Sequence, residues 1–196
     1  MVLVPYPGTP RHQSVELQPI AAARVNTSAL SNARQAVDMG YSWWEAAVTV
    51  APMTIDDARE WRVFFGRLRG AVHSFRLPVT SAAQHDGSFI ARANGAGGGY
   101  SLASDGWPVS TKVLLAGDFV TVGDQLMALD IDVDTDATGN ATLQFHAPLR
   151  RSIADDTIIE TKRPFLTAWL PEGAPALTLN SAQLQDGFSF AATEAY

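Results

Sequence analysis

Apolar positions in the middle of the chain recur with period two, which predicts a small β-module over residues 116–149. Residues 119–122 are mostly apolar and lead into Gly123-Asp124. A Gly/Asp pair between apolar runs is typical of a tight turn between two strands. The sequence therefore predicts a strand on each side of this dipeptide.

The second half of the module alternates in the same way. Residues 126–134 interleave apolar side chains with aspartates, the turn-rich stretch 136–140 follows, and residues 141–146 alternate again. The two runs predict an antiparallel hairpin. Pro148 should end it, because proline lacks the N–H that a central strand donates.

A different period marks the segment Thr54–Arg69. Thr54 with Asp57 three residues later is typical of a capped helix start, and Gly70 supplies a C-terminal stop. The apolar residues recur at spacings of three and four and form one stripe: Ile55, Ala58, Trp61, Phe65 and Leu68. We expect a single helix over about 54–69, packed against a sheet.

Between residues 81 and 108 the composition shifts to Gly, Ala, Ser and Asp. Residues 158–196 again contain apolar runs typical of β-strands. The predicted fold is mainly β. Residues 1–85 plus 158–196 would form a β-sandwich collar domain that carries the helix. Residues 86–157 would form an inserted, small β-barrel-like or sandwich-like peripheral domain.

Composition narrows the function classes. The chain has 196 residues, a net charge of −6 and no cysteine, which excludes disulfides and thiolate sites. A chain with this acidic balance is not expected to bind nucleic acid specifically through its phosphates. Neither a signal peptide nor an apolar stretch of the roughly 20 residues that span a bilayer is present, so we expect no membrane insertion.

Two stretches partly match known ligand-binding loops, one for calcium and one for phosphate, but each lacks essential residues. The aspartates at 130, 132, 134 and 136 lack the glycine and the final glutamate of a calcium loop, and fit better as a solvated strand face. The glycine-rich run 95–99 lacks the lysine of a phosphate loop and fits a linker. With no nucleophile–base pattern, we expect no catalytic, cofactor or metal site and no enzyme activity.

Aromatic residues are the remaining candidates. Trp43 and Trp44 are adjacent in a strand-like run, so their side chains point to opposite faces and cannot share one core. Tyr41 lies two residues earlier, on the Trp43 face. Either a helix covers one face and a sheet the other, or one face lies at a subunit interface, where tryptophan concentrates. Tyr41, Trp43 and Trp44 are the candidate interface residues.

The chain also resembles distal tail proteins and related minor tail proteins of long-tailed bacteriophages and gene transfer agents, over most of residues 40–155. The motifs that carry the resemblance are residues 61–70 leading into 75–78, Ala103–Pro108, and 116–119 continued through 136–141 to 148–150.

The resemblance implies a structural virion protein that forms a hexameric ring at the distal end of the tail. The ring would join the tail tube protein to the hub protein and the adsorption apparatus, after assembly in the host cytoplasm. In such rings the collar domain forms the hexamer and the peripheral domain projects outward. The long strand-like run from Arg34 to Pro52 independently favours a ring, since an overlong hairpin can extend a neighbouring sheet.

The main alternative is a carbohydrate- or receptor-binding module of the tail tip. Aromatic side chains that project from the peripheral domain would then stack on a host saccharide, with Tyr100 and Trp107 as the candidates.

Overall fold

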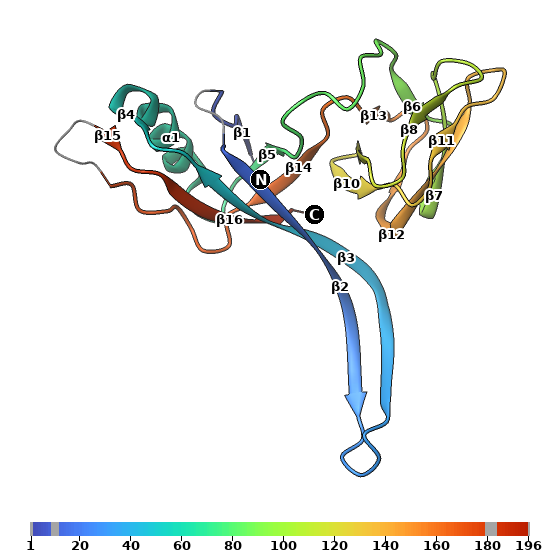
Figure 1. Ribbon diagram of the computed structural model, residues 1–196, viewed down its shortest axis with the longest axis horizontal. Helices are drawn as coiled ribbons and strands as arrows, with labels where there is room; N and C mark the ends of the chain where they lie inside the picture. Colours follow the sequence, from blue (N-terminus) through green and yellow to red (C-terminus); the bar gives the residue numbers. More distant parts are fainter. Residues whose placement is uncertain (1, 9–11, 179–183, 196) are drawn as a thin grey trace. The chain divides into compact units, whose positions relative to one another are not determined.

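The computed structural model describes residues 2–8, 12–178 and 184–195, which form one helix and sixteen strands (Figure 1). The elements are β1 (Leu3–Val4), β2 (Ser14–Thr27), β3 (Arg34–Val50), β4 (Met53–Thr54), α1 (Ile55–Leu68), β5 (Ser74–Pro78), β6 (Ala91–Ala93), β7 (Gly97–Asp105), β8 (Lys112–Leu114), β9 (Phe119–Val122), β10 (Gln125–Ala128), β11 (Val133–Asp134), β12 (Ala141–Ile153), β13 (Ile158–Glu160), β14 (Phe165–Trp169), β15 (Leu184–Gln185) and β16 (Phe188–Glu194). The predicted mainly β fold class is confirmed.

The chain divides into two compact units. Unit 1 comprises Met1–Gln18, Trp44–Ser81 and Phe165–Tyr196, and unit 2 comprises Pro19–Trp43 and Ala82–Pro164. The second stretch of unit 2 begins at Ala82, close to the predicted domain boundary at residue 86, and ends at Pro164, later than the predicted boundary at residue 157. The reason is β13, which pairs with β6 and β9 inside unit 2. Most of the β2–β3 hairpin, Pro19–Trp43, also groups with unit 2, although we predicted these residues within the collar.

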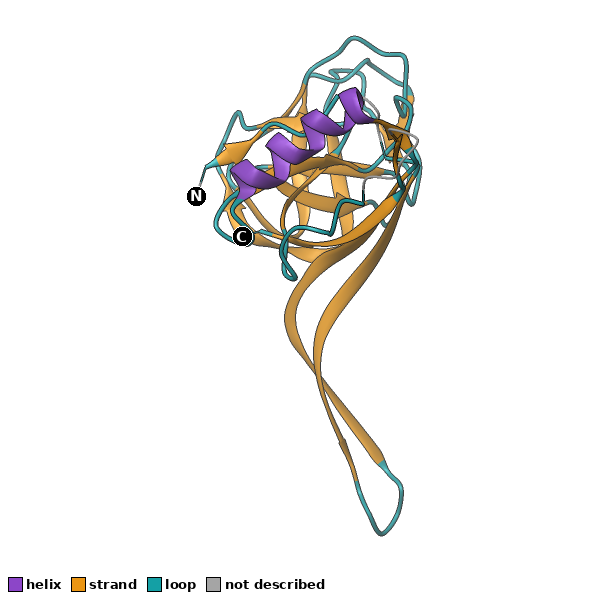
Figure 2. Ribbon diagram, turned by 90° about the vertical axis from the view of Figure 1, so that its left-hand side faces the viewer, coloured by secondary structure: helices purple, strands orange, loops and turns teal. Residues whose placement is uncertain are grey.

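Unit 1 is built on one face of a mixed sheet with the order β1-β5-β14-β16-β3-β2, in which β2 and β3 continue beyond the unit. Helix α1 covers that face (Figure 2). Trp61 is fully buried and packs edge-on against Phe188 of β16, while Phe64 packs edge-on against Phe75 of β5. Buried aromatic area of this kind is the main stabilising contribution to a small core.

Helix α1 begins and ends as its local sequence predicts. The hydroxyl of Thr54 accepts a hydrogen bond from the N–H of Asp57 and donates one to its carboxylate. The chain then turns out of the helix through Arg69 and Gly70, whose φ angles are 50° and 65°. Left-handed backbone at this position is typical of a helix C-cap.

Unit 2 contains a nearly closed β-barrel. Its sheet has the order β10-β9-β13-β6-β7-β12, and a bridge from Leu129 to Phe145 joins the two end strands. The inward side chains form one continuous apolar core that includes Leu102, Val120 and Leu143. Closure removes the exposed strand edges that an open sheet of this size would leave.

The predicted turn at Gly123-Asp124 is present between β9 and β10, and both residues have positive φ. The predicted hairpin between 126–134 and 141–146 is present only in part: an antiparallel bridge joins Leu129 to Phe145, and the N–H of Asp130 donates to the carbonyl of Gln144. The regular ladders of these strands have other partners. Strand β12 pairs with β7, and β11 pairs with β8. Pro148 also does not end its strand: the register shifts between Gln144 and Leu149, and an irregularity of this kind accommodates a residue without an N–H.

Candidate functional site

The β2–β3 hairpin is exposed over most of its length. Every residue from 23 to 41 is exposed, on both faces and through the connecting loop. Figure 1 shows these strands as a long two-stranded ribbon. We call residues 23–41 the ribbon. A two-stranded ribbon with no buried face is at best marginally stable in water, so this length of ordered strand indicates a surface that is covered in use.

The ribbon also exposes large apolar side chains. They are Val25, Leu30, Val37, Met39 and Tyr41. Its formal charges are few, namely Arg24, Arg34 and Asp38. Apolar residues gathered on an exposed strand pair are typical of an interaction surface and are a liability for an isolated chain.

Local hydrogen bonds hold the tip of the ribbon in a defined turn. The hydroxyl of Ser28 accepts from the N–H groups of Leu30 and Ser31, and the Ser28 N–H donates to the carbonyl of Ala33. Nearer the base of the ribbon, the carboxylate of Asp38 accepts from the N–H of Gly40 at 2.9 Å. The tip is therefore organised by short polar side chains rather than by packing.

The three predicted interface residues lie where the ribbon meets the rest of β3. Tyr41 is exposed, and its ring stacks on that of Trp43 at a centroid distance of 6.2 Å. Trp43 and Trp44 are half-buried. The N–H of Trp44 donates to the carboxylate of Glu194, which is itself buried. The aromatic pair Tyr41–Trp43 thus continues the apolar surface of the ribbon, and Glu194 fixes the strand beside it.

Only one of the two strands of the ribbon could be predicted from the sequence. The overlong run after Arg34 predicted a long strand, and β3 does extend over 17 residues. Strand β2 escaped prediction because Ser14–Thr27 shows weak alternation and contains Pro19. The length of β3 was the available indication, since a strand of 17 residues requires a partner of similar length.

Of the two candidate glycan contacts, Trp107 does not fit the structure. Its side chain is only 5% exposed, and it belongs to the barrel core. Tyr100, on β7, is 53% exposed and could be reached by a ligand. A single exposed tyrosine does not define a stacking platform, so no observed geometry favours the carbohydrate-binding alternative.

The aspartates at 130, 132, 134 and 136 do not form a common face. Asp132 pairs with Lys112, Asp130 lies 3.1 Å from His146, and only Asp134 is in a strand. Asp136 accepts hydrogen bonds from the N–H groups of Thr138 and Asn140, which hold the pKa of its carboxyl far below the ordinary value. Within the described ranges no group of three or more His, Asp or Glu is arranged to hold a metal ion.

Comparison with known proteins adds no assignment: no family model and no curated protein matches the sequence. No helix in the described part of the chain is both long and apolar enough to cross a membrane. The resemblance to phage tail proteins therefore stays a prediction, and the exposed ribbon is the observation on which a function can be argued.

Proposed function

We propose that this chain is a structural subunit of a hexameric ring at the distal end of a bacteriophage tail. In this role the ring joins the tail tube protein to the hub protein and the adsorption apparatus, and it becomes part of the virion after assembly in the host cytoplasm. The ribbon carries the proposal: an ordered strand pair of this length with apolar side chains on its surface needs neighbouring chains to cover it.

The sheet of unit 1 supports self-association. Its end strands are β1 and β2, so both ends of the sheet present strand edges. Strand edges can add to the sheet of a neighbouring copy through main-chain hydrogen bonds. A head-to-tail contact of this type closes into a ring when the rotation between copies is a simple fraction of a full turn.

Light scattering on a sizing column, followed by two-dimensional class averages in the electron microscope, tests the proposal. The wild-type chain should form particles with six-fold symmetry. A ribbon variant with Val25→Thr, Val37→Thr and Met39→Thr should be mainly monomeric, since threonine keeps the strand preference but removes apolar area.

A matched control replaces three exposed apolar residues by threonine outside the ribbon. Val109, Ile131 and Ile158 are exposed apolar residues of unit 2, and their replacement by threonine should leave the particles unchanged. A wild-type chain that stays monomeric at high concentration would refute the proposal. Rings formed equally well by the ribbon variant would show that the ribbon is not what holds copies together.

A further inference from the structure

Unit 1 has a groove that is apolar and basic, between the N-terminal segment and helix α1. Two adjoining hollows form it, and both are lined by Val4, Pro5 and Arg67. Val2, Leu3 and Val63 are exposed along it. Small proteins rarely leave apolar side chains clustered beside a groove without a partner for them.

The charged side chains of this groove are mainly arginines. Arg59, Arg67 and Arg69 line it together with one acid, Glu60. Arg59 pairs with Asp56 on the exposed side of the helix. Within residues 2–8, 12–178 and 184–195, Arg67 and Arg69 make no ion pair or side-chain hydrogen bond. Two guanidinium groups are thus available to an acidic partner.

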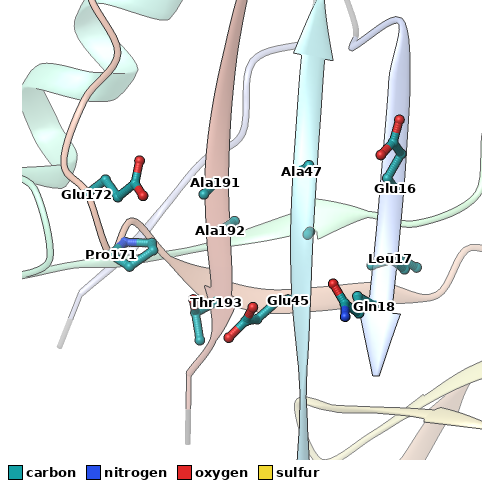
Figure 3. A pocket seen from close by; sticks show the side chains of 11 residues that line it. Glu16, Leu17, Gln18, Glu45, Ala47, Pro171, Glu172, Ala191, Ala192 and Thr193 are labelled. Carbon is teal, nitrogen blue, oxygen red and sulfur yellow. The ribbon is translucent and has the colours of Figure 1, made fainter. Parts of the chain in front are cut away.

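Another hollow of unit 1, separate from the two that form the groove, has the opposite character. It lies over β3 and β16, where Ala47 and Ala191 are directly paired and leave a shallow floor (Figure 3). Its carboxylates come from three separate segments of the chain, namely Glu16, Glu45 and Glu172. No basic side chain lines it among the described residues.

The two surfaces belong to opposite ends of one sheet. The basic groove adjoins β1, the first strand in the order, and the acidic hollow includes residues of β2, the last. A chain with two different, complementary surfaces associates head to tail, because each copy offers one surface to the copy before it and the other to the copy after it.

We propose that the surface around the groove of one copy, with Arg67 and Arg69, packs against the surface around the acidic hollow of the next copy, with Glu16 and Glu172. The inference rests on the ring proposed above and names its contact surfaces. Charge complementarity selects a second copy of this chain as the occupant, since each copy supplies both partners of the contact. The small floor of alanines lets the arginine side chains approach the carboxylates closely.

Charge reversal tests the pairing. Variant A carries Arg67→Glu and Arg69→Glu, so both of its surfaces are acidic. Variant B carries Glu16→Lys and Glu172→Lys, so both are basic. Each variant alone should need a protein concentration at least roughly tenfold higher for half-maximal assembly, because like charges then face each other. Melting curves close to that of the wild type establish that both variants are folded.

Mixing the two variants is the decisive step. An equimolar mixture of A and B should assemble near the wild-type concentration, since every contact in an alternating ring then joins an acidic to a basic surface. Assembly of the wild type should also weaken as salt screens these exposed charges. Arg151→Glu with Arg163→Glu, two exposed arginines of unit 2, is the matched control and should assemble as the wild type does.

The outcomes separate this inference from the proposed function. If the wild type forms rings and variants A and B form them equally well, the pairing of these surfaces is wrong while the ring stands. If A and B fail alone and their mixture fails too, the surfaces do not meet each other and the pairing is again wrong. If the wild type never assembles, both proposals fall.

Discussion

The indole nitrogen of Trp107 lies 2.9 Å from the hydroxyl oxygen of Ser104, and both side chains are buried. Ser104 in turn donates to the carbonyl of Ala141, so one short chain of hydrogen bonds links the loop after β7 to the start of β12. A buried indole normally needs such a partner for its N–H. The pair explains why Trp107 belongs to the core of unit 2 instead of a ligand surface.

Replacement of Trp107 should therefore act on stability. Trp107→Ala should lower the free energy of unfolding of unit 2 by roughly 3–5 kcal/mol, through lost burial and the cavity left behind. Tyr100→Ala, at an exposed position of β7, should change it by less than about 0.5 kcal/mol. Chemical denaturation followed by tryptophan fluorescence and circular dichroism measures both. Equal effects of the two substitutions would contradict the assigned burial.

Gly106, beside Trp107, should tolerate no side chain. Its φ is 79°, and a Cβ there would lie 2.3 Å from the carbonyl oxygen of Ile90. Gly117 has a similar φ of 89° but open space around it. We expect Gly117→Ala to cost about 1–2 kcal/mol for its backbone alone, and Gly106→Ala to cost clearly more, because the backbone of Ile90 must also move. Thermal unfolding compares them, and equal costs would show that the steric contact is unimportant.

Local features of the fold could be predicted from the sequence, and long-range pairings could not. Helix α1 followed from Thr54, Asp57 and Gly70, because capping and apolar spacing act within a few residues. The turn at Gly123-Asp124 followed for the same reason. The partner of β12 did not, since a strand alternates in the same way whichever neighbour it has.

The candidate site shows the same division. Tyr41, Trp43 and Trp44 could be predicted as interface candidates because side chains at adjacent strand positions point to opposite faces, whatever the rest of the fold. Whether Trp107 is exposed depends on Ser104 and Ala141, and Ala141 lies 34 positions later in the chain. Prediction of the exposed ribbon likewise required prediction of β2. The sequence of β2 alternates too weakly for that.

The turn around Asp136 predicts a pH dependence. Hydrogen bonds from the N–H groups of Asn140 and Thr138 depress the pKa of this carboxyl from its ordinary value of 3.8. The stabilisation is fully present above that value, where the unfolded chain is also ionised, and is lost as the pH falls toward the lower folded-state pKa. Asp136→Asn should thus lower the melting temperature at pH 6, and the difference from wild type should shrink below about pH 4.

Melting curves recorded from pH 6 down to pH 2 check this expectation. Asp134→Asn is a suitable control, because Asp134 is also exposed and lies only two positions earlier. Its effect on the melting temperature should be smaller than that of Asp136→Asn. A difference between Asp136→Asn and wild type that stays constant down to pH 2 would show that the turn does not depend on the ionised carboxylate.

The two glycines near the end of helix α1 should respond to the same substitution with opposite signs. Gly66 lies inside the helix with open space where a Cβ would be, so Gly66→Ala should raise the free energy of unfolding by roughly 0.5–1 kcal/mol. Gly70 also has open space but a φ of 65°, so Gly70→Ala should lower it by about 1–2 kcal/mol. Denaturant titrations of both variants measure the two changes. Stabilisation by Gly70→Ala would mean that the helix does not end in left-handed backbone at this residue, and a loss with Gly66→Ala would mean that the helix does not extend through it.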